Sequence, residues 1–498
     1  MDYDYDVLIA GGGPTGITLA VLLGQSGLSV LVVEKEPEIY PLPRAAHIDH
    51  EIMRIFQQVG IADQLMTTCR HADRYDFLNA KGKILLRFDG SSAIGKGGWP
   101  AANMIHQPSL EKALRDRLVD MPTVELQCAT ELASYCDSKN GVIATVIDER
   151  GSREVRARFL VGADGARSSV RKAAGIEFDD LGFEEPWLVV DAIVKDASRL
   201  PTSNLQICDP ERPTTCVLMG QGRHRWEFMI KPGENAEDIS SDASVDRLLK
   251  PWNVDGAVTL ERKAVYTFRA RVARHWRKDN VMLAGDAAHQ TPPFAGQGLC
   301  SGIRDGANLA WKLAAVVRGD ASPDLLDTYQ PEREPNVRAT IKMAIMMGRT
   351  VCTTNRFSAF LRDCKFRLAR ALKLTPDAPP AYPPILRGAI LIGNMGAGSY
   401  FPQPIADQTR IPKLDNLLGS GAWLLSRGHA IGSEHCVAVT INDVKLQPYA
   451  SALTKWLDEH NTEAVLVRPD RYVFGIGVSE DLSVDWQKML QTGTTSGR

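Results

Sequence analysis

The sequence predicts an α/β protein with an inserted, mainly antiparallel β layer and a further small domain near the C-terminus. Short apolar strands run into Gly-rich turns that open helices, at Gly11, Gly162 and Gly285. From 186 to 268 the pattern changes to strands of alternating polarity, which indicates a sheet with one solvated or ligand-facing side. A Pro-rich stretch at 376–384 then precedes a last segment that again alternates strands and helices.

Length and composition are ordinary for a globular protein. At 498 residues the chain is long enough for two or three domains. Apolar residues make up 44% and charged residues 24%, as is usual for globular proteins. The formal net charge of -2 argues against nucleic acid or an anionic membrane as the principal partner.

Cysteine and histidine usage and hydropathy suggest a cytoplasmic protein without a metal or a membrane segment. The nine cysteines form no CxxC pair, no secretory signal pattern precedes the first strand, and no apolar run is long enough to span a bilayer. The ten histidines show no HxH or HExxH spacing, so no metal site is expected. A homodimer is the default expectation for the oligomeric state.

The N-terminus carries the first motif with chemical content. A predicted strand at 5–10 leads into a Gly-x-Gly-x-x-Gly turn that opens a helix, and a second strand at 29–33 is followed by an acidic residue. The glycines allow a tight turn and close approach to a pyrophosphate, and an acid about 20 positions on binds ribose hydroxyls. The motif predicts a dinucleotide site, without separating NAD from FAD. Its residues are Gly11, Gly13, Pro14, Thr15, Gly16, Glu34 and Lys35.

The stretch from 281 to 298 is the second motif. A short apolar strand ends in a Gly-Asp pair at Asp286, a Pro- and Gly-rich loop follows, and a helix is predicted from about Leu299. The Asp286 carboxylate can accept hydrogen bonds from a polyol or ribityl chain. The amides at Gly296, Gly298 and Leu299 form a positive helix N-terminus, which suits the negative charge of a reduced flavin. The alternative is an ordinary strand–loop–helix crossover.

Several further polar or aromatic residues are candidates for the same site. Arg44 suits a pyrophosphate or a flavin edge, and Gln107, just ahead of a helix, suits a cofactor hydrogen bond. Asp164 is a second carboxylate at a strand end, where a turn residue is the alternative. His47 lies near a helix start and contacts either substrate or solvent. Trp226 lies on an alternating strand, where a core position is the alternative to a pocket position.

Together these residues resemble the single-component (class A) FAD-dependent aromatic hydroxylases. Three fingerprints match in order: Gly11-x-Gly13-x-x-Gly16 with Glu34, Gly162-Ala-Asp164-Gly165, and Gly285-Asp286 with Pro292 and Pro293. Other runs are most similar to the 3-(3-hydroxyphenyl)propionate hydroxylase and phenol hydroxylase branch: Pro43-Arg44-Ala45, Arg225-Trp226-Glu227-Phe228 and Ser301-Gly302-Ile303-Arg304-Asp305. The resemblance covers essentially the whole chain.

The resemblance implies a Rossmann-like FAD-binding domain with an inserted, mainly antiparallel β-sheet substrate domain and a C-terminal thioredoxin-like domain. The expected boundaries are 1–180 for the first part of the FAD-binding domain, with 72–100 contributing to the substrate domain, 181–268 for the substrate sheet, 269–375 for the second part of the FAD-binding domain with its helices, 376–390 for a linker, and 391–498 for a thioredoxin-like domain without CxxC.

The resemblance also implies residue roles. Glu34 binds the adenosine ribose, Arg44 and Gln107 contact the pyrophosphate and ribityl region, and Asp286 binds the ribityl or pyrophosphate part. Asp164 supports FAD and transient nicotinamide docking, and the loop with Gly296 and Gly298 lines the flavin ring. The residues implied at the substrate are His47, Trp226, Pro293 and Phe294. Cys300 departs from the family, since many members carry Asn there; flavin tuning is then left to backbone amides.

The implied activity is an FAD-dependent monooxygenase that uses NAD(P)H and O2 to hydroxylate a phenolic, 3-hydroxyphenylpropionate-like or resorcinol-like substrate through a flavin C4a-hydroperoxide. His47 is the candidate base that favours the phenolate, and Pro293 lies beside the flavin and substrate. Alternatives are a tailoring or resistance hydroxylase of a polycyclic natural product, a flavin-dependent reductase without oxygen insertion, and a non-catalytic FAD-binding interaction protein. The sequence leaves the choice between NADH and NADPH open.

Overall fold

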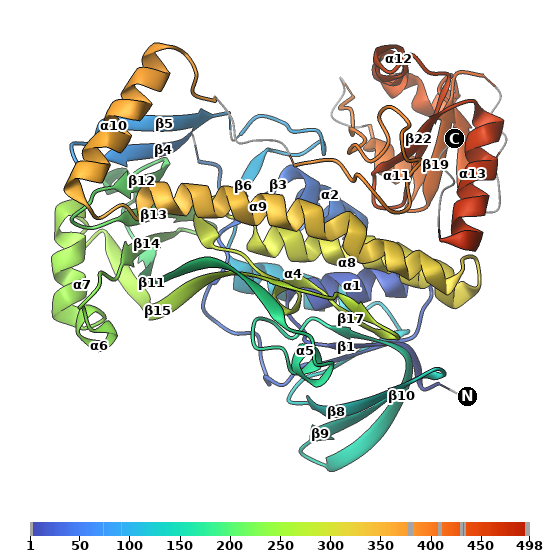
Figure 1. The fold of residues 1–498 in the computed structure, drawn as a ribbon, viewed down its shortest axis with the longest axis horizontal. Coiled ribbons are helices and arrows are strands. Elements are labelled where there is room, and N and C mark those ends of the chain that lie inside the picture. The colour runs from blue at the N-terminus through green and yellow to red at the C-terminus, as the bar shows by residue number, and fades with distance from the viewer. Residues whose placement is uncertain are drawn as a thin grey trace.

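The computed structural model describes residues 3–72, 74–90, 92–376, 382–406, 411–428, 432 and 435–493. Two eight-stranded sheets are spanned by the long helices α8 (Gly298–Arg318) and α9 (Tyr329–Val351), and a four-stranded sheet lies near one end of these helices (Figure 1). Part of the predicted linker, 377–381, lies outside the described residues. No helix among the described residues is long and apolar enough to cross a membrane.

The first sheet has the order β16-β17-β10-β1-β2-β7, and β8 and β9 extend it as a hairpin beside β10. β1 pairs in parallel with β2 and β10, and β10 with β17, as expected for apolar strands buried on both faces. The strands are β1 (Tyr5–Ala10), β2 (Val30–Val33), β7 (Val124–Gln127), β8 (Glu131–Ser138), β9 (Gly141–Asp148), β10 (Gly151–Gly162), β16 (Arg277–Lys278) and β17 (Val281–Leu283).

Helices cover this sheet and begin where its strands end. α1 packs against α8, and Gly319 ends α8 in the left-handed conformation that its sequence position predicted. The other helices of this part are α1 (Pro14–Gln25), α2 (His50–Val59), α3 (Ala62–Met66), α4 (Gln107–Leu118) and α5 (Ser169–Ala173). A small two-stranded sheet, β3 (His47–Asp49) with β6 (Ala102–Met104), leads the chain into α2.

The second sheet has the order β18-β15-β11-β14-β13-β12-β4-β5. It is antiparallel except where β4 pairs in parallel with β12, so the hairpin at 74–89 is part of this sheet. β11 and β15 run beyond the 181–268 range expected for the substrate layer. The strands are β4 (Arg74–Asn79), β5 (Ile84–Asp89), β11 (Phe178–Val194), β12 (Asn204–Cys208), β13 (Thr214–Met219), β14 (Arg223–Met229), β15 (Val258–Ala273) and β18 (His289–Gln290).

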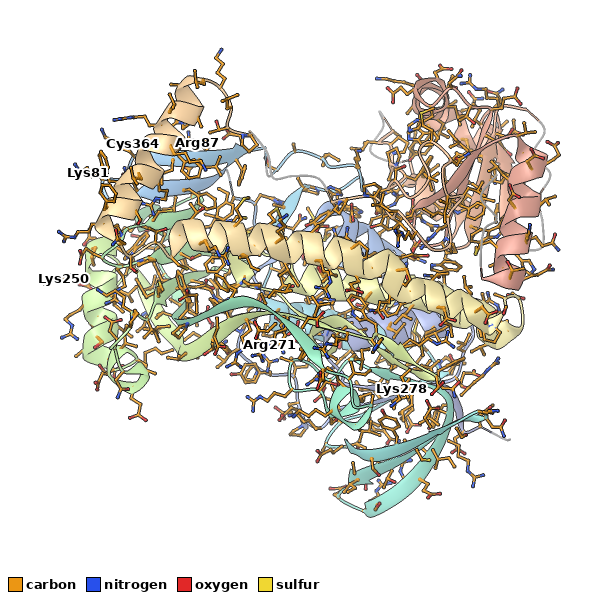
Figure 2. All side chains as sticks on the ribbon, viewed as in Figure 1. Lys81, Arg87, Lys250, Arg271, Lys278 and Cys364 are labelled. Atoms are coloured by element: carbon orange, nitrogen blue, oxygen red, sulfur yellow. The ribbon has the colours of Figure 1, made fainter. Side chains whose placement is uncertain are left out.

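One face of the second sheet is a hydrophobic core. Trp226 and Phe228 of β14 pack there with Val245 and Leu249 of α7 (Asp242–Leu249), which follows α6 (Ala236–Ile239). α10 (Arg356–Ala371) lies along the edge strand β5 (Figure 1). Side chains fill the space between the layers, and Lys81 and Lys250 project from the surface (Figure 2).

The third unit has a sheet of order β20-β19-β21-β22, in which β19 is parallel to β20 and antiparallel to β21. α12 packs on one face of this sheet, and α13 packs on the other. On the α13 side, the ring centroids of Trp486 and of Trp311 of α8 lie 5.8 Å apart. Its elements are α11 (Leu414–Leu418), β19 (Ala422–Ser426), β20 (Cys436–Thr440), α12 (Ala450–Glu459), β21 (Ala464–Val467), β22 (Val473–Gly477) and α13 (Ser479–Thr492).

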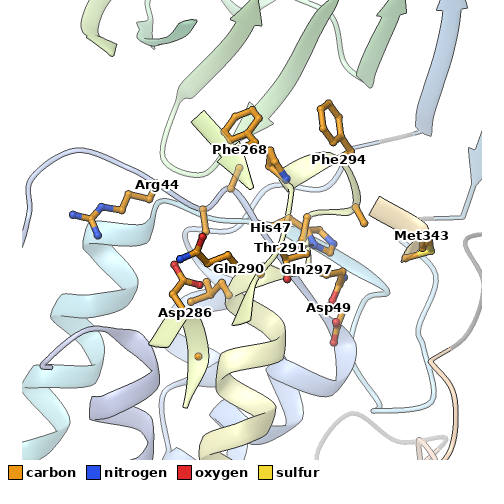
Figure 3. A pocket seen from close by; sticks show the side chains of 18 of the residues that line it. Arg44, His47, Asp49, Phe268, Asp286, Gln290, Thr291, Phe294, Gln297 and Met343 are labelled. Atoms are coloured by element: carbon orange, nitrogen blue, oxygen red, sulfur yellow. Dashed lines mark hydrogen bonds between the residues drawn. The ribbon is translucent and has the colours of Figure 1, made fainter. Parts of the chain in front are cut away.

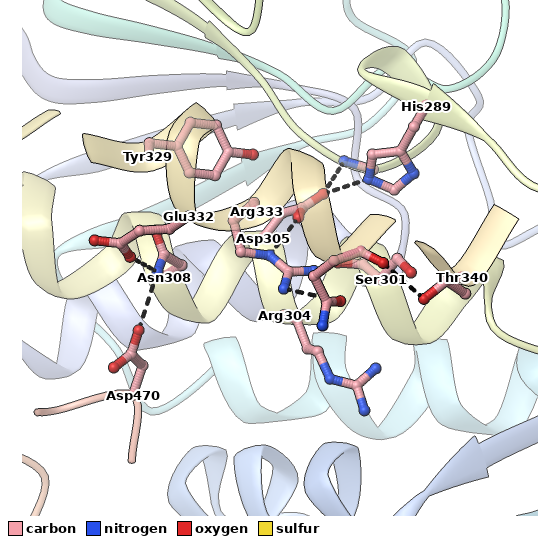
Figure 4. A network of polar contacts seen from close by, with 12 residues as sticks. His289, Ser301, Arg304, Asp305, Asn308, Tyr329, Glu332, Arg333, Thr340 and Asp470 are labelled. Atoms are coloured by element: carbon pink, nitrogen blue, oxygen red, sulfur yellow. Dashed lines mark hydrogen bonds and ion pairs between the residues drawn. The ribbon is translucent and has the colours of Figure 1, made fainter. Parts of the chain in front are cut away.

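Buried ion pairs join this third unit to the long helices. Glu332 of α9 accepts a hydrogen bond from Arg468 at 2.7 Å and lies 2.9 Å from Lys312 of α8. Asn308 donates to both Glu332 and Asp470 (Figure 4). Since these side chains are almost fully buried, the contact belongs to the folded core and is not a loose surface association.

Candidate active site

A cavity of about 3450 Å³ is lined by residues of both large sheets. Pockets for drug-sized ligands measure about 300–1,000 Å³, so this cavity has room for a dinucleotide and a second molecule. It brings together most of the residues that the sequence singled out. Those that line it are Gly11, Gly13, Pro14, Thr15, Glu34, Lys35, Arg44, His47, Gln107, Asp164, Asp286, Pro293, Phe294, Gly296, Gly298 and Leu299.

The first glycine turn is built for a ligand at one position and for packing at two others. Gly11 has φ +108°, and a Cβ there would lie 2.4 Å from the Ala163 carbonyl oxygen. A Cβ at Gly16 would lie 2.0 Å from the Gly11 oxygen, and Gly16 does not line the cavity. The missing side chain of Gly16 thus serves the close approach of helix and strand, and a direct contact of Gly16 with the cofactor stays a prediction.

Gly13 differs from the other two glycines because it opens onto free space. A Cβ at Gly13 would meet no atom within 4 Å, and no side chain caps the N-terminus of α1 at this residue. The free amides of a helix N-terminus attract anions. The turn therefore fits a pyrophosphate group.

Glu34 follows β2 at the edge of the same turn. Its carboxylate accepts hydrogen bonds from the amides of Gly12 at 2.7 Å and Glu36 at 3.0 Å, which fixes its orientation beside the turn. The Lys35 side chain is largely exposed and lies 3.7 Å from Glu36. Glu34 is thus placed for a ribose, whereas Lys35 contributes charge at the rim.

Asp286 lies in a short 3-10 turn (Gly285–Ala287) after β17, with its carboxyl open to the cavity (Figure 3). It forms no hydrogen bond with any residue that the structure describes. Desolvation by the surrounding cavity wall raises the pKa of this carboxyl, and His289 and Arg44 oppose that rise. Asp286 therefore fits a ligand that donates hydrogen bonds, such as a ribityl chain.

A buried residue that the sequence did not single out as a site residue holds this turn. Asp305 of α8 accepts from the Gly285 amide at 3.1 Å and pairs with His289 at 2.7 Å and with Arg333 at 2.9 Å (Figure 4). These charges lower the pKa of Asp305 despite its complete burial. Its partners lie 16 to 28 residues away in the sequence, so no local pattern indicated this role.

The loop from 291 to 299 forms the wall next to His47. Gly296 adopts φ +63°, and its carbonyl oxygen lies 3.2 Å from His47 Nδ1. A carbonyl only accepts, so this bond places the proton on Nδ1 and leaves Nε2 as an acceptor. Desolvation lowers the pKa of His47, which favours the neutral ring. α8 then begins at Gly298 without a side-chain cap, so its first amides are free for a ligand.

Phe294 is the centre of an aromatic cluster at the cavity wall. Its ring centroid lies 5.6 Å from Trp187, 5.8 Å from Phe183 and 6.1 Å from Phe268. Phe268 and Phe294 both line the cavity (Figure 3). This wall suits a flat aromatic ligand.

Three other predicted cofactor residues line the cavity, but two of them bond the protein itself and the third lies exposed at the rim. Gln107 accepts from the Ala45 amide at 2.6 Å and donates to Glu111 at 2.7 Å, so it orients the chain near Arg44. One Asp164 oxygen caps α5, accepting from the amides of Ser169 and Val170. The Arg44 side chain is exposed at the rim (Figure 3).

Two residues do not occupy the places that the resemblance implied. Trp226 is fully buried on the core face of β14, so the prediction that it contacts substrate is wrong. Successive strand residues point to opposite faces, and the cavity side belongs to Arg225 and Glu227 instead. The Cys300 thiol is buried 3.8 Å from the carbonyl oxygens of His47 and Gly296 and does not line the cavity.

Comparison with known proteins identifies the family. The family described as FAD binding domain matches residues 4–344, and the HcaD C-terminal domain matches residues 429–492. A probable NADH-specific resorcinol 4-hydroxylase of Rhodococcus jostii (strain RHA1) is 38% identical, over 95% of this chain and 92% of its own. A 3-(3-hydroxy-phenyl)propionate/3-hydroxycinnamic acid hydroxylase of Mycolicibacterium gilvum (strain PYR-GCK) is 35% identical, over 94% and 88%.

Solved structures agree with this relationship. A crystal structure of a ternary complex of aklavinone-11 hydroxylase with FAD and aklavinone matches with a TM-score of 0.77 and 25% identity, over 98% of this chain and 99% of that chain. The chain therefore belongs to the FAD-binding domain family. Within it, the protein is a single-component FAD-dependent aromatic hydroxylase that uses NAD(P)H.

Proposed function

We propose that the protein uses NADH, FAD and O2 to add a hydroxyl group to a phenol, ortho or para to an existing one. The observation that carries this proposal is the continuity of the cavity, which joins the open turn at Gly13 and Asp286 to the aromatic wall and the His47 ring. The resorcinol 4-hydroxylase relative supports a dihydric phenol as substrate and NADH as donor.

Residues in different parts of the cavity have different roles in this proposal. The turn at Gly13, with Glu34 and Asp286, binds the dinucleotide, and the 291–299 loop with the α8 N-terminus holds the flavin ring. Bound FAD supplies hydride acceptance and oxygen activation. The buried aromatic wall excludes water. His47 Nε2 accepts the phenol proton, which makes the ring a stronger nucleophile.

We also propose the finer domain roles that the sequence suggested. Residues 1–180 and 269–375 bind FAD, the inserted sheet binds substrate, and the third unit is a thioredoxin-like domain without a redox pair. Its support is the order β20-β19-β21-β22, with a parallel pair, an antiparallel hairpin and a final helix. The homodimer stays a prediction.

The test is NADH and NADPH oxidation by the FAD-loaded protein with resorcinols, phenolic acids and polycyclic phenols, with products analysed in parallel. One phenol should accelerate NADH oxidation strongly and return with one added hydroxyl group. Strong acceleration without oxygen insertion, or a saturated product, would refute the hydroxylase assignment and favour a reductase.

A polycyclic phenol is the second candidate substrate. The cavity volume and the similarity to the aklavinone-11 hydroxylase complex favour it. In the same panel, a polycyclic phenol that is hydroxylated while the resorcinols are inert would establish this candidate.

His47→Phe should slow hydroxylation about a hundredfold, the lower end of the range for a general base. Flavin reduction by NADH should change little, since the role proposed for His47 is to accept the proton of the phenol, which is not part of hydride transfer. Because the pKa of His47 is lowered, its base form should persist to a more acidic pH than an ordinary histidine allows. Rapid-mixing absorbance measures flavin reduction and hydroxylation separately. The control is His275→Phe, at an exposed position, which should change neither rate. An unchanged hydroxylation rate would remove His47 from the mechanism.

A further inference from the structure

Glu227 is a carboxyl group that faces the active-site cavity without a hydrogen-bond partner. It lies on β14 between Trp226 and Phe228, whose side chains point to the opposite, core face. The Glu227 side chain is 9% exposed and forms no hydrogen bond with any residue in the described part of the chain. Its oxygens therefore have only the cavity in which to find a partner.

The nearest cation, Arg225, is already engaged. Its Nε and Nη2 donate to Asp191 at 2.6 and 3.1 Å, and its Nη1 and Nη2 donate to the carbonyls of Arg44 and Pro43 at 2.6 Å each. These contacts use four of the five guanidinium N–H groups. Arg225 Nη1 lies 3.7 Å from Glu227 Oε1, which is beyond hydrogen-bond distance. Arg225 thus holds the 43–44 backbone and leaves the Glu227 carboxyl free for a ligand.

Three other polar side chains on this face, Thr215, Gln206 and Tyr75, form a chain of hydrogen bonds. Thr215 donates to Gln206 at 2.7 Å, Gln206 donates to the Tyr75 hydroxyl at 2.7 Å, and Tyr75 donates to the Phe294 carbonyl at 3.0 Å. Tyr75 and Glu227 both line the cavity. Phe294 lies two residues from Gly296, which bonds His47. Glu227 therefore faces the same ligand space as the predicted base.

A buried carboxyl without a donor is costly, whether ionised or neutral. Burial raises the pKa of Glu227 to about 7, although Arg225 opposes the shift. In both protonation states the group accepts a hydrogen bond from a ligand hydroxyl. A bound hydroxyl group would therefore supply the partner that the protein does not.

We propose that Glu227 binds a second hydroxyl group of the aromatic substrate, so that the preferred substrate is a neutral dihydric phenol of the resorcinol type. This inference rests on the proposed function and narrows it. A substrate that carries a carboxylate would meet Glu227 as a like charge in a desolvated site, where such repulsion is strong.

The test compares ligand affinity in wild type, Glu227→Leu and Glu227→Gln, each loaded with FAD. Resorcinol, phenol and 3-(3-hydroxyphenyl)propionate are titrated without NADH or oxygen, and the change in flavin absorbance gives each Kd. Wild type should bind resorcinol about 10- to 100-fold more tightly than phenol, as expected for a hydrogen bond to a charged group. In Glu227→Leu the two affinities should become similar, with phenol binding retained.

Glu227→Gln keeps the shape and one acceptor oxygen but removes the negative charge. It should bind resorcinol less tightly than wild type does and bind the propionate more tightly relative to resorcinol. This variant keeps the proposal testable if the leucine variant fails to fold. Glu237→Gln, at an exposed position on α6, is the matched control and should leave all three affinities unchanged.

Equal binding of phenol and resorcinol by wild type, or an unchanged preference in Glu227→Leu, would overturn the role of Glu227. Preference of wild type for the propionate would overturn the substrate class. These outcomes are distinct from failure of the proposed function, which would appear as binding without hydroxylation when NADH and oxygen are supplied.

Discussion

Asp286→Ala is expected to purify without bound FAD. The carboxylate is the open, unpartnered acceptor at the end of β17, and a ribityl chain offers it two hydroxyl donors. At about 1.5–3 kcal/mol for each hydrogen bond to a charged group, loss of two bonds weakens FAD binding about 10²- to 10⁴-fold. The ratio of flavin to protein absorbance measures retention, and titration of the apoprotein with FAD gives Kd.

Lowering the pH should weaken FAD binding by the wild-type protein, as removal of the Asp286 carboxylate does. Since desolvation in the cavity raises the pKa of Asp286, its acceptor form is lost at a higher pH than the ordinary aspartate pKa implies, so FAD retention should weaken as the pH falls. Asp255→Ala, at an exposed position in the inserted layer, is the matched control and should retain FAD fully. Stoichiometric FAD in the purified Asp286→Ala protein would contradict the assigned role.

Glu332→Ala is expected to give the largest loss of stability. Glu332 accepts hydrogen bonds from Arg468 and Asn308 at 2.7 Å each, and Lys312 lies 2.9 Å away. Removing the carboxylate leaves the buried cations Arg468 and Lys312 with Asp470 as their one nearby carboxylate among the residues that the structure describes. Removing one partner of a buried pair typically costs about 3–5 kcal/mol, measured here by denaturant unfolding of the holoenzyme. The third unit should also become more sensitive to limited proteolysis, because this network joins it to α8 and α9.

The same network predicts a direction of pH dependence. Arg468 and Lys312 lower the pKa of Glu332 to about 2, against the opposing effect of burial. The stabilisation is therefore complete above the ordinary glutamate pKa of about 4.3 and is lost as the pH falls toward 2. Glu334→Ala on the same helix is the control, since its pair with Arg338 is partly exposed and should contribute less than about 1 kcal/mol. An equal decrease in the free energy of unfolding in Glu332→Ala and Glu334→Ala would refute the importance of the buried network.

The elements with strong local signals were predicted well. Apolar runs at 5–10 and 29–33 form parallel strands, and the Gly-Asp pair at Asp286 follows a strand as expected. Alternation in the 225–228 run predicted a strand with two distinct faces. It did not decide which face meets the ligand, so Trp226 was assigned to substrate although Glu227 faces the cavity.

The site contacts that the sequence did not predict join residues that are distant in the sequence. Tyr75 bonds the carbonyl of Phe294, and Asp305 holds Gly285 while pairing with Arg333. Each contact joins segments that carry no common pattern. Their side chains look like ordinary strand or helix residues until the sheets and helices pack against each other.

The sequence by itself determined the strand–turn–helix units and the glycine positions, because backbone preference and apolar periodicity act over a few residues. Only the tertiary structure decided that Gly16 serves packing, that Asp286 stays free for a ligand, and that Glu227 lacks a partner. Those properties depend on which atoms surround a group after folding, and burial, charge and hydrogen-bond satisfaction are set by neighbours from the whole chain.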